Sequence, residues 1–417
     1  MARPLTKSTG QEEYGQSMQR SPCVAMPMKL DHDMRKLPKQ ATPRQWLPSA
    51  FLVLAIACPA LADSVPRKTQ NILVVTLDGF RWQEIFAGAD ESLLDEKKGG
   101  VRDLPGLKRR YWRDSPAARR EALLPFLWGT VVRQGQIFGN PARKAAARCT
   151  NGLKFSYPGY SEMFCGFADP RIDSNDKKDN PNLSVLEFLN AKPPWRGSVE
   201  AICTWEVFPF IFRSRRSGLP VHAGWKPLNG ESLTQRERDL NEFLQRVPRI
   251  WPDNALDVFT MEAARSALER RHPRVLYIGL GETDEWGHGR RYDLYLDAAH
   301  KADRFLAETW QALQRVPQYR EQTALVVTTD HGRGATWTDW TDHGRAVPGA
   351  EFIWVAVLGP DTPALGERQD IEVTQGQVAA SIALLLGEDF ISASPRAARP
   401  LPSIVLGEGA SPKRTDR

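Results

Sequence analysis

The sequence predicts an α/β fold with a doubly wound, mostly parallel central sheet flanked by helices, to which peripheral insertions are added. Three apolar runs, at residues 71–77, 274–280 and 323–329, are almost free of charged residues. Such continuous runs are typical of parallel strands that are buried on both faces. Segments with helical periodicity separate the runs, and this alternation predicts one large α/β domain, which we place at residues 63–394.

The first strand ends at Asp78, and the segment that follows it begins with an insertion. Residues 87–114 are rich in Gly, Asp, Lys and Arg, so we expect them to be exposed. Ser115 followed by Pro116 predicts the start of a helix with the serine as its N-cap. Apolar residues at helical spacing continue as far as Val131.

The remaining elements alternate in the same way along the chain. We expect a strand at 198–203, a peripheral insertion dense in Arg, Pro and Trp near 204–255, the strand at 274–280, a long amphipathic helix at 294–313, the strand at 323–329, a further strand at 351–358 and a helix at 375–386. Residues 395–417 are rich in Pro and Arg and are predicted to be a mobile tail.

The N-terminus has the pattern of an exported protein. Basic residues lie between 35 and 44, an apolar run fills 51–57, and the small residues Ala60 and Ala62 follow. This order is that of a secretory signal peptide, so residues 1–62 are predicted to be an extension with a cleavable signal. The apolar run is shorter than the ~20 residues of a membrane span, and an uncleaved anchor is the alternative. We expect a periplasmic or secreted protein with no membrane span after cleavage.

Charge and cysteine content argue against two other kinds of site. The net charge of +6 is small for 417 residues. Much of the excess lies before residue 63, so no nucleic-acid-binding patch is expected. Cys149, Cys165 and Cys203 follow the predicted cleavage site, and no CxxC pair occurs. A thiolate metal site is therefore not expected.

Carboxylates and histidines gather just after the predicted strands. They are Asp78 after the first strand, Asp284 and His288 after 274–280, Asp330 and His331 after 323–329, and His343 in the loop that follows. Open α/β sheets place their chemistry at the carboxyl ends of their strands. A mixed set of carboxylate oxygens and imidazole nitrogens suits zinc, with manganese as the alternative. The pattern predicts a site for divalent metal ions.

Over residues 71–386 this pattern resembles the alkaline phosphatase superfamily, particularly its type I phosphodiesterase/nucleotide pyrophosphatase branch. The superfamily has an Asp after the first strand, a nucleophile that opens a helix, a DxxxH pair, a DH-G pair and a final His, and the chain supplies each in that order. The resemblance implies two divalent metal ions. One would be held by Asp284, His288 and His343, and the other by Asp78, Asp330 and His331.

Two serines compete for the role of nucleophile. In the phosphodiesterase branch a Thr or Ser is followed by an aromatic residue and Pro, with a Gly ten positions on. Ser156, followed by Tyr157 and Pro158, matches this spacing with Gly166. Ser161 precedes a Glu, as the nucleophile of phosphoglycerate mutases does. A structural alternative for Ser156 is that its hydroxyl caps the following helix.

The resemblance implies hydrolysis of a small-molecule phosphoester, either a phosphodiester or a phosphomonoester. A metal-activated serine would attack phosphorus and form a phospho-serine intermediate. Asn151 and Arg333, which lie near site residues in the sequence, are candidates for contacting phosphate oxygens, and a surface position is the alternative for Arg333. Five aromatic residues beside the motifs could line the substrate site or pack in the core; they are Tyr157, Tyr160, Trp286, Trp337 and Trp340.

Two other functions remain open at this stage. A sulfatase-like hydrolase would share the fold, but its nucleophile motif has an Arg where this chain has Tyr160. A non-catalytic metal-binding module would have lost the nucleophile or a ligand, and this chain retains both. Substrate specificity would come from residues 87–150 and 204–255.

Overall fold

The computed structural model describes residues 67–230 and 232–406. The predicted N-terminal extension and signal peptide, residues 1–62, lie outside these ranges, and so do residues 407–417 of the predicted tail. Among the described residues, no helix combines the length and hydrophobicity needed to cross a bilayer.

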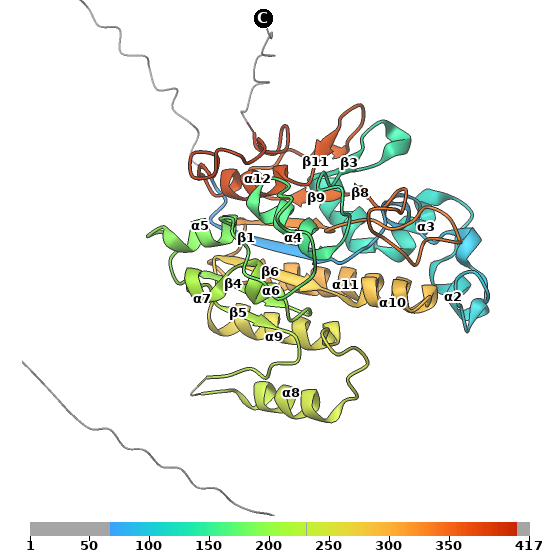
Figure 1. The fold of residues 1–417 in the computed structure, drawn as a ribbon, viewed down its shortest axis with the longest axis horizontal. Coiled ribbons are helices and arrows are strands. Elements are labelled where there is room, and N and C mark those ends of the chain that lie inside the picture. The colour runs from blue at the N-terminus through green and yellow to red at the C-terminus, as the bar shows by residue number, and fades with distance from the viewer. Residues whose placement is uncertain (1–66, 231, 407–417) are drawn as a thin grey trace, which may run out of the picture. The chain divides into compact units, whose positions relative to one another are not determined.

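A large, mostly parallel sheet forms the centre of the described chain (Figure 1). From edge to edge its eight strands are β10 (Gly366–Glu367), β2 (Gln136–Phe138), β9 (Val355–Leu358), β7 (Thr323–Thr328), β1 (Asn71–Leu77), β6 (Val275–Leu280), β4 (Val199–Cys203) and β5 (Val221–Ala223). Only β9 runs antiparallel to its neighbours. A smaller sheet joins β11 (Val373–Thr374), β3 (Ala147–Arg148) and β8 (Phe352–Ile353).

Helices cover both faces of the large sheet. Leu73 and Val75 of β1 belong to one hydrophobic core and Ile72 and Val74 to the other, because alternate side chains of a strand point to opposite faces. The first core includes residues of α1 (Trp82–Ala87), α2 (Leu104–Tyr111), α3 (Pro116–Leu123), α9 (Asp257–Arg270) and α11 (Tyr292–Leu313). The second includes residues of α4 (Ser156–Cys165), α5 (Val185–Ala191), α6 (Phe208–Ile211) and α12 (Gln377–Leu385). The predicted α/β fold class is confirmed.

Short elements complete the fold. They are α7 (Ser214–Ser217), α8 (Gln235–Arg246), which lies beyond α9 in Figure 1, α10 (Glu282–His288), the 3-10 turns Glu91–Leu93 and Pro141–Arg143, and a π-helical segment at Leu127–Val132.

The predicted helical stretch from Ser115 to Val131 is present but is interrupted at Leu124. Ser115 is the N-cap, and its hydroxyl oxygen accepts a hydrogen bond from the Ala118 N–H at 3.2 Å. The helix ends before Pro125, which cannot donate a backbone hydrogen bond. Helical structure resumes at Pro125 and continues into the π-helical segment Leu127–Val132. There the buried carboxylate of Asp303 accepts the N–H groups of Phe126 and Leu127 at 2.8 Å each.

Both predicted insertions are more integrated than expected. In 87–114, the side chains of Leu93, Leu107 and Tyr111 are buried in the first core, so this segment is not simply exposed. Within 204–255, strand β5 pairs with β4 and extends the sheet by one strand. The expected strand at 351–358 is divided between the two sheets, because the chain switches at Trp354.

The prediction of a mobile tail does not hold for residues 395–406. Leu401, Ile404 and Val405 are at most 2% exposed and belong to the second core. These apolar side chains lie in a Pro-rich stretch without helical or strand periodicity, so packing fixes them without regular structure.

We expect Ile404→Ala to destabilise the protein by about 2–5 kcal/mol, because it would leave a cavity in the second core. Leu406→Ala is the matched control: its side chain is 60% exposed, and the change is expected to stay within about 0.5 kcal/mol. Urea denaturation measures both. Equal effects of the two variants would contradict the packing of this segment.

Candidate metal centre

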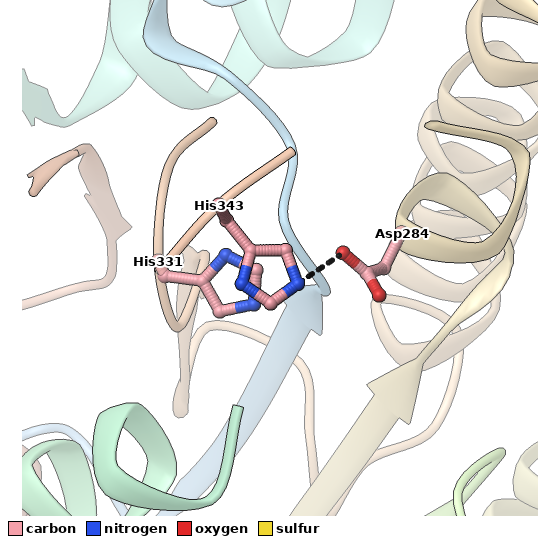
Figure 2. Close-up of side chains that lie close together, drawn as sticks. All are labelled: Asp284, His331 and His343. Carbon is pink, nitrogen blue, oxygen red and sulfur yellow. Dashed lines mark ion pairs between the residues drawn. The ribbon is translucent and has the colours of Figure 1, made fainter. Parts of the chain in front are cut away.

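Three adjacent parallel strands bring the predicted ligands to one place. Thr76 of β1 pairs with Thr328 of β7, and Leu77 pairs with Leu280 of β6, so the strands end at the same level. Asp78 follows β1 directly, Asp330 and His331 follow β7, and α10 after β6 carries Asp284 and His288. Figure 2 shows Asp284, His331 and His343 directed toward one another.

Asp78, Asp330 and His331 form the first group of ligand atoms close enough to share an ion. His331 Nε2 lies 3.4 Å from Asp78 Oδ1 and 3.3 Å from Asp330 Oδ2. Each carboxylate is held through its other oxygen: Asp330 Oδ1 accepts the Gly79 N–H at 3.0 Å, and Asp78 Oδ2 accepts the Tyr160 hydroxyl at 2.9 Å.

The two inward oxygens, Asp78 Oδ1 and Asp330 Oδ2, are buried and accept no hydrogen bond. Leaving a buried acceptor unpaired costs about 1–3 kcal/mol, and more when the group is charged. Burial raises the pKa of Asp78 and Asp330, and each is raised further by a neighbouring carboxylate, Asp284 for the first and Asp78 for the second. A divalent cation would satisfy both oxygens and offset the repulsion, so the donor set fits a metal ion.

His331 is oriented for binding through Nε2. Its Nδ1 lies 2.9 Å from the Gly332 carbonyl oxygen, which can only accept, so Nδ1 carries the proton. Burial lowers the pKa of His331, but the charges of Asp330 and Asp78 outweigh it and raise the pKa to about 9. The same carboxylates that would share the ion therefore attract a proton when no metal is bound.

The second group contains Asp284, His331 and His343. His343 Nε2 lies 3.7 Å from Asp284 Oδ1, and the rings of His331 and His343 have centroids 4.0 Å apart. His288 also lies beside these residues: its Nε2 is 3.3 Å from Asp284 Oδ2 and 2.9 Å from His343 Nε2. All six predicted ligands thus lie in one continuous cluster.

The structure separates the two candidate nucleophiles. Ser156 is the first residue of α4, and its Oγ lies 3.4 Å from His331 Nε2. Phe155 is the N-cap and Ser156 makes no capping hydrogen bond, so its structural alternative is not realised. Ser161 is 1% exposed, and its hydroxyl oxygen accepts a hydrogen bond from Asn180 Nδ2 at 3.0 Å inside the protein.

The two predicted phosphate contacts are engaged elsewhere. Asn151 Oδ1 accepts the N–H groups of Leu153 and Lys154 at 2.9 and 2.8 Å, and its Nδ2 donates to Glu162 Oε2 at 3.0 Å. This side chain shapes the turn before α4. Arg333 is neither at the surface nor in the cavity described below: it is 1% exposed and forms an ion pair with a predicted ligand, Asp284.

Several supporting residues were not predicted. Thr283 Oγ1 donates to the Asp78 carbonyl oxygen at 2.6 Å, and Gln375 Nε2 donates to the Asp330 carbonyl oxygen at 2.5 Å. These contacts join segments far apart in the sequence and leave no local pattern. Among the aromatic residues considered, Trp340 is fully buried, with its Nε1 donating to the Lys98 carbonyl oxygen at 3.1 Å.

A cavity of about 560 Å³ opens beside the cluster. Asp78, Ser156 and Asp284 line it on the side of the cluster. The rest of the lining includes Asn175, Asp176, Lys177, Trp205, Val207, Trp251, Pro252, Asp253 and Asn254. Residues 204–255 therefore contribute much of the lining, whereas residues 87–150 contribute none of it.

Comparison with known proteins agrees with this geometry. Residues 253–387 match the family model of the metalloenzyme superfamily, a range that contains five of the six predicted ligands. The solved structure of wild-type alkaline phosphatase PafA aligns with a TM-score of 0.53 and 11% identity, covering 82% of this chain and 100% of that one. The chain thus shares its fold with alkaline phosphatase PafA, and its residues 253–387 are similar to the metalloenzyme superfamily.

Two other solved structures align with lower TM-scores. The lipoteichoic acid synthase LtaP from Listeria monocytogenes has a TM-score of 0.47 and 13% identity, with 77% of this chain and 72% of that chain covered. The phosphonate monoester hydrolase of Agrobacterium radiobacter has a TM-score of 0.45 and 11% identity, with 80% and 78% covered. No curated protein gave a significant match.

Removing metal with a chelator is expected to lower the melting temperature. An ion that binds only the folded state stabilises it by about 2.7 kcal/mol when its free concentration is 100 times Kd. Asp330→Asn removes one of two facing charges while keeping the oxygen that accepts the Gly79 N–H. Without metal this variant is expected to be more stable than the wild type, because the repulsion between the two carboxylates is removed. With excess metal it is expected to be less stable than the wild type, because a candidate ligand is lost. Thermal denaturation with and without EDTA tests this, and identical responses would contradict the metal centre.

Proposed function

We propose that this chain is an exported two-metal phosphoester hydrolase of the type I phosphodiesterase/nucleotide pyrophosphatase-like kind, with Ser156 as its nucleophile. The observation that carries the proposal is the position of Ser156 Oγ, which lies 3.4 Å from His331 Nε2, makes no capping bond and lines the cavity beside the ligand cluster. Export rests on the sequence pattern of residues 1–62 alone.

The ligands divide most simply into the two sets expected from the sequence. His331 belongs to both groups of neighbouring ligand atoms, the one with Asp78 and Asp330 and the one with Asp284. Its Nδ1 is engaged by a carbonyl oxygen, so only Nε2 is free to bind a metal ion. With that nitrogen assigned to Asp78 and Asp330, the second set is completed by His288, which lies within 3.3 Å of Asp284. Three ligands of mixed nitrogen and oxygen character in each set favour zinc, with manganese as the alternative.

The chain's own groups would act in a defined order. Bound divalent cations would lower the pKa of the Ser156 hydroxyl and balance the charge of the phosphoester. Ser156 Oγ attacks phosphorus, the P–O bond to the leaving alcohol breaks, and water later cleaves the phospho-serine. Because Ser156 opens a helix of ten residues, the N-terminal end of the α4 dipole faces the anionic substrate. Tyr160 and the Gly79 N–H keep the two carboxylates fixed during these steps.

The same contacts favour phosphoester over sulfate ester hydrolysis. Tyr160 stands where the sulfatase motif has Arg, and its hydroxyl is committed to Asp78 at 2.9 Å. Two sets of ligands that contain histidine also favour two borderline metals over a single calcium with oxygen ligands.

The leaving alcohol is proposed to lie in the 560 Å³ cavity, against Trp205 and Trp251. Two indole rings provide an apolar wall for a small organic group, and the amide of Asn254 adds a polar contact nearby. The proposed substrates are therefore small-molecule phosphoesters.

Ser156→Ala is expected to reduce kcat by at least about a thousandfold on the preferred substrate, because no other group supplies the nucleophile. Ser161→Ala, on the same helix, is the control and should keep nearly full activity. The assay compares para-nitrophenyl phosphate, bis(para-nitrophenyl) phosphate and para-nitrophenyl sulfate with zinc or manganese present. Turnover of the sulfate alone would favour the sulfatase alternative. No turnover of any ester would contradict the enzyme proposal.

Trp251→Ala is expected to raise KM for bis(para-nitrophenyl) phosphate by about tenfold, equal to about 1.4 kcal/mol of lost binding, because the wall of the cavity is removed. Trp337→Ala is the control, since Trp337 is 46% exposed and does not line this cavity. Steady-state kinetics measure both variants. A larger effect of Trp337→Ala would place the leaving group elsewhere.

A further inference from the structure

Arg333 connects three segments that carry proposed ligands. It lies two residues after His331, and its Nη1 donates to Asp284 Oδ1 on α10. Its Nε donates to the Trp340 carbonyl oxygen at 3.0 Å, and its Nη2 donates to the Thr341 carbonyl oxygen. Those two carbonyl groups belong to the loop that leads to His343. One guanidinium therefore holds two ligands of the same proposed metal set in fixed relation.

The surroundings of Arg333 are built to accommodate its guanidinium. A Cβ added at Gly287 would lie 2.7 Å from Arg333 Cζ, 2.8 Å from Nε and 2.9 Å from Nη2. A Cβ at Gly79 would lie 2.9 Å from Arg333 Nη1 and 2.6 Å from Asp284 Oδ1. Glycine at both positions leaves the space that the guanidinium fills behind the ligands.

The charge of Arg333 also acts on Asp284. Burial raises the pKa of Asp284, but the charge of Arg333, followed by those of His288 and His343, holds it well below its usual range. Since Oδ1 accepts from Arg333, Oδ2 is the oxygen that faces His288 Nε2, at 3.3 Å. The planar guanidinium gives one donor to this carboxylate and two to the loop carbonyl oxygens, an arrangement that a lysine ammonium would not reproduce.

We propose that Arg333 is a positioning residue for the second metal set, Asp284, His288 and His343, and does not contact the phosphate. This inference rests on the metal assignment of the proposed function. Arg333 is 1% exposed and is absent from the lining of the cavity, so substrate there does not reach it. Outer partners of metal ligands typically contribute about tenfold to a hundredfold to metal affinity.

The first experiment measures metal binding directly, without substrate. Metal-stripped full-length protein is titrated with zinc and, separately, manganese in competition with a chromophoric chelator. Arg333→Met is expected to weaken one of two binding steps by about tenfold to a hundredfold and leave the other nearly unchanged. Arg333→Lys, which keeps the charge but not the fork, is expected to restore only part of the loss.

The second experiment moves the guanidinium without removing its charge. Gly287→Ala places a methyl group against it, whereas alanine normally stabilises a helix by about 1 kcal/mol relative to glycine. Gly289→Ala is the matched control: it lies two residues away, and its Cβ would meet nothing closer than 3.3 Å. Gly287→Ala is expected to weaken the same binding step as Arg333→Met, and Gly289→Ala is not. If Arg333→Met does not fold, the comparison of Gly287→Ala with Gly289→Ala still tests the positioning role of Arg333.

The possible results distinguish failure of the proposed metal-dependent function from failure of the proposed role of Arg333. A wild type that binds no metal contradicts the proposed function and this inference with it. Two wild-type binding steps that persist in both Arg333→Met and Gly287→Ala overturn only the role of Arg333. If those variants instead raise KM and weaken inhibition by inorganic phosphate while metal affinity is unchanged, Arg333 contacts the substrate and the positioning role is wrong.

Discussion

Two buried carboxylates, those of Asp78 and Asp330, face the same imidazole nitrogen, and the rest of the site is organised around this arrangement. It arises because β7, β1 and β6 are adjacent, parallel and level at their carboxyl ends. Without a cation, two like charges on buried carboxylates would be costly, as their raised pKa values indicate. Hydrogen bonds hold both carboxylates in place through one oxygen each, Asp330 Oδ1 and Asp78 Oδ2, and leave Asp330 Oδ2 and Asp78 Oδ1 without a hydrogen-bond partner.

Anchoring by one oxygen recurs at Asp284, with a different partner. There the anchor is the guanidinium of Arg333 and not a neutral donor. The difference follows from position: Asp330 lies beside a backbone N–H at the end of β1, whereas Asp284 lies within a short helix whose own N–H groups point along the axis. A side chain from another segment must supply the donor, and Arg333 reaches it from the β7 segment.

The sequence predicted the parts of the fold and site that local chemistry determines. The apolar run 71–77 coincides with β1, and the predicted ligands that follow strands lie in one cluster because strand ends meet at a sheet edge. Strand β5 was missed because three residues cannot display a periodic pattern. The buried position of Arg333 and the packing of Ile404 depend on partners far away in the chain, so composition alone assigned both to the wrong environment.

The choice between Ser156 and Ser161 illustrates what geometry adds to a motif. Both serines are small, polar and near the same proline, so sequence spacing alone left an alternative. An α-helix turns by about 100° per residue, so five residues rotate the side chain by about 140° after one full turn. With Ser156 facing His331, Ser161 faces away from it, and the buried side chain of Asn180 donates to its hydroxyl. The helix that presents one hydroxyl to the proposed ligands turns the other away from them, and this supports Ser156 over Ser161 as the proposed nucleophile.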